Sequence, residues 1–422
     1  MPVSHINDLE EQLRQDRRLG NARRRKRRLR RLLPIALLLI LVLGLYLLLR
    51  NSGGDAEDST ERPAPGSSSV TLSFVGDICL NEEMLQSFRV GADYDFSPLL
   101  RRIVPRLAAA DLTVGNLEGN VVSNDEVTDY AYPPALLQAL YDVGFDVLQT
   151  SNSYSIQNGI AGLSATKQII REAGMEPLGT WDSQEDREQN GVLIREINGI
   201  RIAFLAFTKG MNNLRLPAGA EYCVNLLYSD YDTNYSKIAR SAIANCVEEA
   251  KAKSPDLIVA MVHWGSEYDK EITDSQSSIA KLLFDSGVSL IIGSHSHLVG
   301  PMELKNRTVS PFGGSFVAYS LGDFISVGAS SAARSGCVLS ITVQKHDGSV
   351  RITNVEYAPT YSAAPDEEYG TTEYELLDTL DTISFYESGY YDRVSEDLYE
   401  RLQSAVARMK EQTGLGDMQA SK

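Results

Sequence analysis

The pattern of apolar and polar positions changes character near Val70. From there on, short apolar runs alternate with longer segments whose apolar residues recur at helical spacing. The runs expected to form strands are Val70–Val75, Leu112–Asn116, Asp146–Thr150, Ile202–Phe207, Leu257–Val262, Ser289–Ile292, Phe316–Ser320, Cys337–Val343 and Val350–Tyr357. The expected helices are Pro133–Val143, Ile160–Ala173, Ser236–Ala252 and Ser275–Ser286. Alternation of this kind predicts an α/β layered fold.

The end of the chain carries two further signals. The last two predicted strands flank His346-Asp-Gly-Ser, a sequence typical of a hairpin turn. Beyond residue 360 the chain is acidic and rich in tyrosine. Apolar residues then recur at helical spacing at Val394, Leu398, Leu402, Ala405 and Met409. We expect a terminal helix that packs against the edge of the domain, in preference to one that binds a partner.

The region before the domain holds one long uncharged apolar run, Leu32–Leu49. At about 1.5 Å per residue its roughly 18 residues just cross a hydrocarbon core of about 30 Å. A buried core helix is the alternative, but such helices usually carry a polar stripe. Basic residues crowd the N-terminal flank between Arg23 and Arg31, which predicts a cytoplasmic N-terminus and an extracellular main domain. A cleaved signal peptide is less favoured, because the run is long and no small-x-small site closely follows it.

These patterns divide the chain into five parts. They are a basic cytoplasmic tail (1–31), a transmembrane helix (32–49), a flexible linker (50–69), the main domain (70–360) and an acidic C-terminal extension with its terminal helix (361–422). Residues 1–50 hold 12 Lys/Arg and 4 Asp/Glu, whereas residues 51–422 hold 28 and 52, a net charge of −24. Such a surface repels nucleic acids, which we exclude as partners. The four cysteines lack C-x-x-C spacing, and the sequence does not pair them.

Polar residues follow several predicted strands directly. In α/β sheets ligands bind beyond the carboxyl ends of the strands, so these residues are expected to converge in one cleft. The candidates are Asp77, Asn116, Glu118, Asn152, His263, His295 and His297.

The composition of this set suits a divalent metal. Three of only five histidines are in it, together with two carboxylates, and imidazole with carboxylate matches Mn, Fe or Zn. A histidine at a strand end is more often structural. The pair His295 and His297 is more specific, because alternate residues of an extended segment point the same way. The sequence therefore predicts a metal-binding cleft and leaves the identity of the metal open.

The motifs in their order resemble one family. They are Gly76-Asp77, Asn116-Leu117-Glu118, His263-Trp-Gly-Ser-Glu-Tyr268, Gly293-Ser-His-Ser-His297 and Tyr319-Ser-Leu-Gly-Asp-Phe324. They resemble the CapA family of poly-γ-glutamate capsule biosynthesis proteins, which are related to calcineurin-like metallophosphoesterases. The resemblance covers about Val70 to Tyr357 and implies a four-layer αββα sandwich. It also implies a metal site made by Asp77, Glu118, His263, His295 and His297.

The chain departs from the family pattern in one segment. Family members usually carry Ala-Asn-Asn-His, with an Asp three residues after the His. Here Asn152 remains, but Ser153, Tyr154 and Gln157 replace the second Asn, the His and the Asp. In the phosphoesterase relatives the Asn-His pair supplies a metal ligand and a group that assists the leaving group, so Asn152 and Tyr154 become the catalytic candidates. Another departure is Asp323, where the family usually has Asn; it adds charge to a metal site or holds a loop.

Three functions follow from these observations. The first is an extracytoplasmic CapA-like protein that assists synthesis or export of poly-γ-glutamate or another capsular polymer, alongside synthase or export subunits. The second is a metal-dependent hydrolase of phosphoesters or envelope polymers. The third is a metal-free binding module, with Trp264, Glu267 and Tyr268 lining a groove for a sugar, a peptide or an anionic polymer. For aromatic residues beside strands, a role in the core is the alternative.

Overall fold

The computed structural model describes residues 67–305, 314–326, 328, 330–365, 373–389 and 394–415. The predicted transmembrane helix Leu32–Leu49, with the tail before it and nearly all of the linker after it, lies outside these residues. Among the described helices, none combines the length and the apolar character that crossing a membrane requires.

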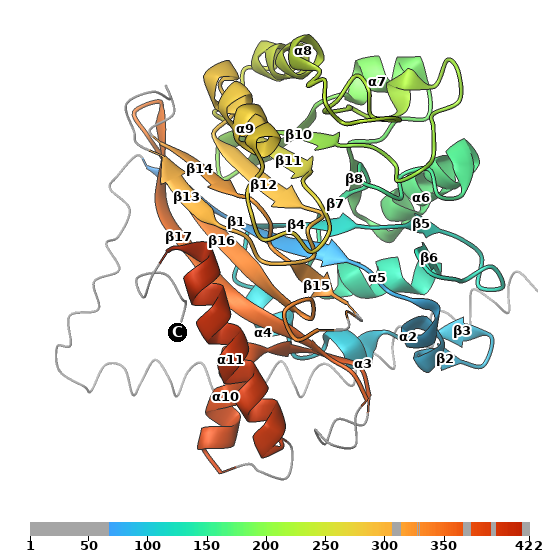
Figure 1. Cartoon of the computed structure of the whole chain (residues 1–422). Coiled ribbons are helices and arrows are strands. Elements are labelled where there is room, and N and C mark those ends of the chain that lie inside the picture. Colours follow the sequence, from blue (N-terminus) through green and yellow to red (C-terminus); the bar gives the residue numbers. More distant parts are fainter. Residues whose placement is uncertain are drawn as a thin grey trace, which may run out of the picture. The chain divides into compact units, whose positions relative to one another are not determined.

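Within the described residues, two mixed β-sheets form the centre of the domain (Figure 1). The strands of the larger sheet are β1 Ser68–Ile78, β4 Leu112–Leu117, β7 Val147–Gln149, β8 Glu176–Leu178, β15 Asp323–Ile325, β16 Ser335–His346, β17 Ser349–Ala363 and β18 Glu375–Asp378. Their order is β18-β17-β16-β1-β4-β7-β8, with β15 paired to β1. Because β1, β4, β7 and β8 are mutually parallel, their carboxyl ends meet at one edge of the sheet.

The smaller sheet has its parallel strands in the middle. Its strands are β9 Leu193–Ile197, β10 Ile200–Thr208, β11 Leu257–His263, β12 Leu290–Ser294, β13 Met302–Lys305 and β14 Ser315–Ala318. They follow the order β13-β14-β12-β11-β10-β9. Two short ribbons lie outside the sheets, β2 Arg89–Val90 with β3 Asp93–Tyr94, and β5 Asn120–Val121 with β6 Ala131–Tyr132.

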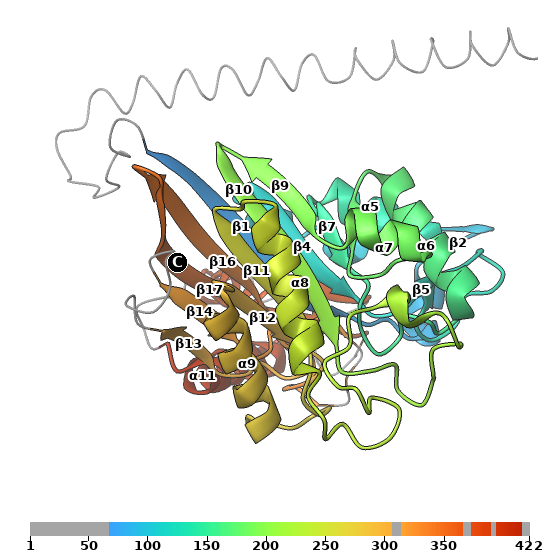
Figure 2. The same ribbon diagram turned by 90° about the horizontal axis from the view of Figure 1, so that it is seen from above.

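Helices flank the two sheets. The described helices are α2 Glu82–Ser87, α3 Ser97–Leu100, α4 Val104–Leu107, α5 Pro134–Asp142, α6 Gly159–Ala173, α7 Gln184–Asn190, the 3₁₀ turn η1 Glu221–Cys223, α8 Arg240–Ala252, α9 Asp274–Ser286, α10 Thr379–Glu387 and α11 Glu396–Thr413. Helices α8 and α9 lie over β10, β11 and β12, as Figure 2 shows. Helices α2 to α6 cover the larger sheet, so the predicted αββα layering is confirmed.

Alternation along the strands explains why two sheets stack. In β11, Leu257, Val259 and Met261 face the core between the sheets, whereas Ile258 and Ala260 pack under the outer helices. Both faces of the central strands are buried, which accounts for their nearly continuous apolar sequence. The hairpin between β16 and β17 is also confirmed, with the left-handed φ angles of Asp347 (50°) and Gly348 (76°) that a type I′ turn requires.

The C-terminal region continues the main domain instead of starting a separate extension at residue 361. Strand β17 runs to Ala363, and β18 adds a further strand beside it. The predicted terminal helix is α11, and it packs against β17. Its buried face contains Leu398, Leu402, Ala405 and Met409, as the spacing predicted.

Candidate metal centre

The alternation of side chains along β11 places His263 between the two sheets. Because Leu257, Val259 and Met261 face inward, His263 at the end of the strand faces inward too, and it is fully buried. Its Nδ1 lies 2.9 Å from Ser294 Oγ, at the end of the neighbouring β12. This hydrogen bond fixes the ring plane and leaves Nε2 directed at the larger sheet.

A β-bulge turns Asp77 toward the same space. Phe74 pairs with Val114 and Asp77 with Asn116, so β1 has one residue more than β4 between these pairs. The extra residue reverses the alternation, and Asp77 faces inward, where strict alternation would direct it outward. Gly76 is required beside it, since a Cβ there would lie 1.8 Å from the carbonyl oxygen of Gly322.

Strand β4 supplies two further polar groups on its inward face. Val114 faces the core, and Asn116 and Glu118 follow it at alternate positions. Asn116 donates a hydrogen bond from Nδ2 to Asp77 Oδ1 at 2.7 Å. Glu118 is fully buried and accepts a hydrogen bond from Cys79 Sγ on Oε2 at 2.9 Å.

The segment that carries His295 and His297 is not an extended strand, so the assumption behind the expectation that they point the same way was wrong. The segment after β12 is not extended, because His295 and His297 have left-handed φ angles of 97° and 57°. This conformation is uncommon for non-glycine residues, and strained residues of this kind cluster at functional sites as well as in turns. The His295 N–H donates to Asp77 Oδ2 at 3.0 Å and so ties this loop to the opposite sheet.

The five predicted ligands nevertheless come together as two groups that share one carboxylate. Glu118, His263 and His295 form one group, and Asp77, Glu118 and His297 form the other. In each group the ligand atoms lie within 4.8 Å of one another and every residue is buried. Within these two groups, His263 Nε2 lies 3.1 Å from Glu118 Oε1, and His297 Nδ1 lies 3.9 Å from Asp77 Oδ2.

The chemistry of this cluster fits a divalent cation. Glu118 Oε1 and His295 Nδ1 are buried without a hydrogen-bond partner, an arrangement that folded proteins otherwise avoid. Carboxylate and imidazole are the ligands that Mn, Fe and Zn accept, and acidic groups this close together need positive charge between them. The residues present therefore fit divalent metal, which Asp77, Glu118, His263, His295 and His297 would hold.

Burial disfavours the charged forms of the side chains in this cluster, and their pKa values shift accordingly. Burial raises the pKa of Asp77 to about 6, and burial with the nearby Asp77 charge raises the pKa of Glu118 well above its ordinary value. Burial also lowers the pKa of His263 strongly and that of His295 to about 3. Burial opposes the charged form of His297 too, but its hydrogen bond to Asp323 and the surrounding carboxylates outweigh this and raise its pKa to about 10.

Two residues beside the ligands had no firm place in the sequence prediction. Asp323 of β15 pairs in register with Asp77, and its Oδ1 lies 2.8 Å from His297 Nδ1. This ion pair holds the His297 ring beside Asp77. Cys79 forms a third close group with His297 and Asp323. Its position two residues after Asp77 was the available signal, since alternate strand residues share a face.

The Asn152 segment lies next to the cluster, and its side chains are engaged locally. Asn152 Nδ2 donates to Asn116 Oδ1 at 3.0 Å and to the Leu117 carbonyl at 2.7 Å. Its Oδ1 accepts the N–H of Tyr154 at 3.0 Å. Asn152 thus holds the loop against β4. Its predicted catalytic role stays a prediction.

Ser153 and Tyr154 occupy the positions where family members usually carry an Asn-His pair. Ser153 Oγ lies 3.0 Å from His263 Nε2. The Tyr154 ring stacks on Tyr130, with ring centroids 3.7 Å apart, and burial raises the pKa of its hydroxyl to about 12. Tyr154 therefore keeps its proton at neutral pH and can donate it or a hydrogen bond, but it cannot act as a base.

The three predicted groove residues are placed differently from one another. Trp264 is fully buried under the outer helices, stacks on Tyr319 and donates from Nε1 to the Tyr319 carbonyl, so it belongs to the core. The parity of β11 explains this, since Trp264 follows the inward His263. Tyr268 is 57% exposed, with its ring 5.4 Å from that of His297. Glu267 lines a cavity beside the cluster.

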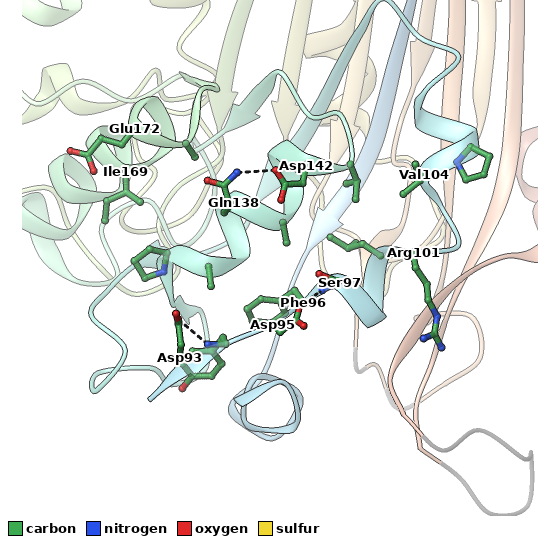
Figure 3. A pocket seen from close by; sticks show the side chains of 18 residues that line it. Asp93, Asp95, Phe96, Ser97, Arg101, Val104, Gln138, Asp142, Ile169 and Glu172 are labelled. Carbon is green, nitrogen blue, oxygen red and sulfur yellow. Dashed lines mark hydrogen bonds between the residues drawn. The ribbon is translucent and has the colours of Figure 1, made fainter. Parts of the chain in front are cut away.

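That cavity has a volume of about 240 Å³ and adjoins the metal cluster. It is lined by Ser153, Lys209, Asn212, Tyr235, Ser266, Glu267 and His295. A larger groove of about 920 Å³ lies on the side of the larger sheet, between β3, α3, α5 and α6 (Figure 3). Its lining includes Asp93, Arg101, Gln138, Asp142 and Glu172, but none of the metal-cluster residues. The smaller cavity is therefore the one that serves the cluster.

Comparison with known proteins agrees with the motifs. The family described as bacterial capsule synthesis protein PGA_cap matches residues 71–327. The chain belongs to this family. It is 26% identical over 268 residues to "Capsule biosynthesis protein CapA" of Bacillus anthracis, covering 61% of this chain and 59% of that protein. It is 27% identical over 272 residues to "PGA biosynthesis protein CapA" of Bacillus subtilis, covering 61% and 63%. The chain thus spans about three fifths of the length of these relatives.

Two solved structures resemble the domain weakly. A phosphatase of Mycoplasma pneumoniae aligns with 69% of this chain and 93% of its own at 13% identity, with a TM-score of 0.42. The calcineurin-like phosphoesterase YfkN of Bacillus subtilis aligns with 81% of this chain and 98% of its own at 13% identity, with a TM-score of 0.41. Similarity of this degree carries no argument about function.

Proposed function

We propose that this protein is a membrane-anchored, extracellular member of the capsule synthesis machinery and that its buried cluster is a two-metal hydrolytic centre. The expected substrate is a capsular polymer such as poly-γ-glutamate, cleaved during synthesis or export. The observation that carries the proposal is the pair of three-ligand groups sharing Glu118, with the buried ligand atoms Glu118 Oε1 and His295 Nδ1 lacking a hydrogen-bond partner. The anchor is the predicted helix Leu32–Leu49.

Each metal would be held by residues from both sheets. Glu118, His263 and His295 would hold one ion, and Asp77, Glu118 and His297 the other, with Asp323 orienting His297. A pair of divalent ions supplies Lewis-acid polarisation of a carbonyl or phosphoryl oxygen and activates water.

The protein's own groups would prepare this site in three ways. Ser294 fixes the His263 ring through Nδ1, and Asn116 fixes the Asp77 carboxylate through Oδ1. Burial of the cluster excludes bulk water and strengthens every charge interaction within it. Tyr154, whose hydroxyl holds its proton at neutral pH, would donate a proton or hydrogen bond to the leaving group.

Metal stoichiometry tests the proposal directly. The full-length protein, purified without chelator, should contain about two divalent ions per chain. Glu118→Gln should lose both because it belongs to both groups, whereas His295→Ala should lose about one. His346→Ala is the matched control, since His346 lies in the β16–β17 hairpin and belongs to neither group.

Turnover distinguishes the remaining possibilities. Hydrolysis of a γ-glutamyl oligomer or a phosphodiester that follows metal content across these variants would establish the hydrolase. Full metal content with no turnover of either substrate would instead support an accessory role in polymer assembly. Wild-type protein that takes up no Mn, Fe or Zn would overturn the metal centre and leave a metal-free binding module.

A further inference from the structure

The small cavity beside the cluster is placed to hold the part of a substrate next to its reacting bond. It shares His295 with one metal group, and its Ser153 hydroxyl lies 3.0 Å from His263 Nε2. With a volume of about 240 Å³, the cavity accommodates a group of the size of one amino-acid residue. A chain cleaved at the cluster must therefore place a neighbouring unit here.

The cavity is built around one cation, Lys209. This residue follows β10, and its N–H donates to the His263 carbonyl at 2.8 Å, so its backbone is tied to a candidate ligand. The Lys209 ammonium donates to the Gly265 carbonyl at 2.6 Å and lies 4.8 Å from the centre of the Tyr235 ring. Both contacts hold the long side chain at the cavity.

Lys209 forms no close ion pair in the described part of the chain, although the negative charge of Glu267 acts on it. No carboxylate oxygen there lies within 4.0 Å of its Nζ, although Glu267 lines the same cavity. An ammonium group has three N–H donors, and the Gly265 carbonyl takes one of them. Lys209 is half-buried and keeps N–H donors that the Gly265 carbonyl does not use. Residues 51–422 carry a net charge of −24, so such a cation is unusual here, and it is suited to bind an anion.

The other polar groups in the cavity decide between anions. Ser153, Asn212 and Ser266 are neutral, and Glu267 is acidic. A phosphate dianion would meet one positive and one negative charge here, and its second charge would face Glu267. The unit of a peptide-type chain that carries a carboxylate next to an amide N–H matches both charges, since Lys209 pairs with the carboxylate and Glu267 accepts the N–H.

We infer that this cavity is a carboxylate-binding subsite in which Lys209 selects amino-acid chains with free carboxylates. The inference rests on the proposed function, because it assumes that the reacting bond lies at the metal cluster. Such a subsite would also explain how a protein with an acidic surface binds an acidic substrate. The general repulsion disfavours binding, and one half-buried cation favours it at a single position.

Binding by the full-length, Mn-loaded protein tests this subsite. The probes are a fluorescent γ-linked glutamate pentamer with free α-carboxylates and the same pentamer with α-carboxamides. We expect the acid form to bind the wild type more tightly, and Lys209→Met to weaken that binding roughly 10- to 100-fold, the range for loss of a charge-assisted hydrogen bond. Lys209→Arg should restore most of it, which shows that Lys209→Met did not act through misfolding.

A matched control removes the same charge elsewhere. Lys281→Met lowers the net charge equally at an exposed pair with Asp285 and should leave binding unchanged. Equal binding of the two pentamers by a wild type that carries its metal would overturn this inference and leave the proposed metal centre standing. Displacement by inorganic phosphate at lower concentration than by glutamate would overturn it as well. Absence of metal in the wild type would overturn the proposed function itself.

Discussion

Replacing Asp77 by Asn should stabilise the metal-free protein and destabilise the metal-loaded one. Asp77 is fully buried, and burial raises its pKa from the ordinary 3.8 to about 6. Each pKa unit corresponds to about 1.4 kcal/mol, so the ionised carboxylate costs the folded state about 3 kcal/mol above pH 6. Asn carries no charge and avoids this cost.

A loss of hydrogen bonding offsets part of the gain. The carboxylate accepts from Asn116 Nδ2 at 2.7 Å and from the His295 N–H at 3.0 Å. The amide oxygen of Asn keeps one of these bonds, and losing the other costs about 1–2 kcal/mol. With chelator at pH 7.5, Asp77→Asn should therefore be more stable than the wild type by about 1–2 kcal/mol.

The gain depends on pH in a defined direction. Between about pH 4 and pH 6 the folded state keeps a proton on Asp77 that the unfolded chain has released, so raising the pH destabilises the wild type. Below pH 4 the carboxyl is protonated in both states and the charge-related gain vanishes. Asp77→Asn should lack this part of the pH dependence of the unfolding free energy.

Metal should invert the order of stability. At a hundred times its Kd, a ligand that binds only the folded state adds about 2.7 kcal/mol to the wild type, and Asp77→Asn loses most of this. Urea unfolding with EDTA and with Mn²⁺ measures both states. Asp111→Asn is the control, because exposed Asp111 also accepts a backbone N–H, at 2.8 Å from Thr71, and should show no inversion. Equal destabilisation of Asp77→Asn under both conditions would refute the reasoning and make Asp77 a structural carboxylate.

Three further changes test other parts of the structure. Gly76→Ala places a Cβ 1.8 Å from a backbone oxygen, so it should lower the free energy of unfolding by about 3 kcal/mol and also lower the metal content. Gly144→Ala is the control, because its Cβ meets open space at a φ of 106°; it should cost about 1 kcal/mol of stability and keep the metal. Lys167, whose side chain is 1% exposed, forms ion pairs with Asp182 and Asp186. Lys167→Met removes both pairs, so the free energy of unfolding measured in urea should fall by about 2 kcal/mol while the metal content stays the same. Tyr154→Phe keeps the stacking on Tyr130 and removes the proton donor, so turnover should fall roughly tenfold or more while metal content stays the same; unchanged turnover would exclude Tyr154 from the chemistry.

The central strands could be predicted because the apolar pattern that identifies them lies within a few consecutive residues. Runs such as Leu257–Val262 are apolar on both faces, and only a strand between two packed layers requires that. The same parity separates His263, which faces inward, from Trp264, which belongs to the core. Strand alternation alone, applied along β11, is therefore enough to exclude Trp264 from the predicted groove.

Other features depend on contacts that no local pattern records. The bulge that turns Asp77 inward is set by pairing with β4, and strict alternation would have placed Asp77 on the wrong face. His295 and His297 lie in a loop after β12 where both have left-handed φ angles, and strand alternation does not predict such a conformation. The three residues of β15 are too few to show a period, yet they bring Asp323 beside His297.

The division of ligands between the sheets yields a last prediction. The carboxylates Asp77, Glu118 and Asp323 belong to the larger sheet, and the histidines to the smaller one. A metal ion that binds both kinds must join the sheets at this end, where the His295 N–H already donates to Asp77 Oδ2 at 3.0 Å. Hydrogen exchange should therefore slow on adding Mn²⁺ in residues 294–297 and 116–119, and remain unchanged in the hairpin at 346–349. Uniform slowing across the domain would mean that the metal stabilises the fold globally and does not act through a junction between the two sheets.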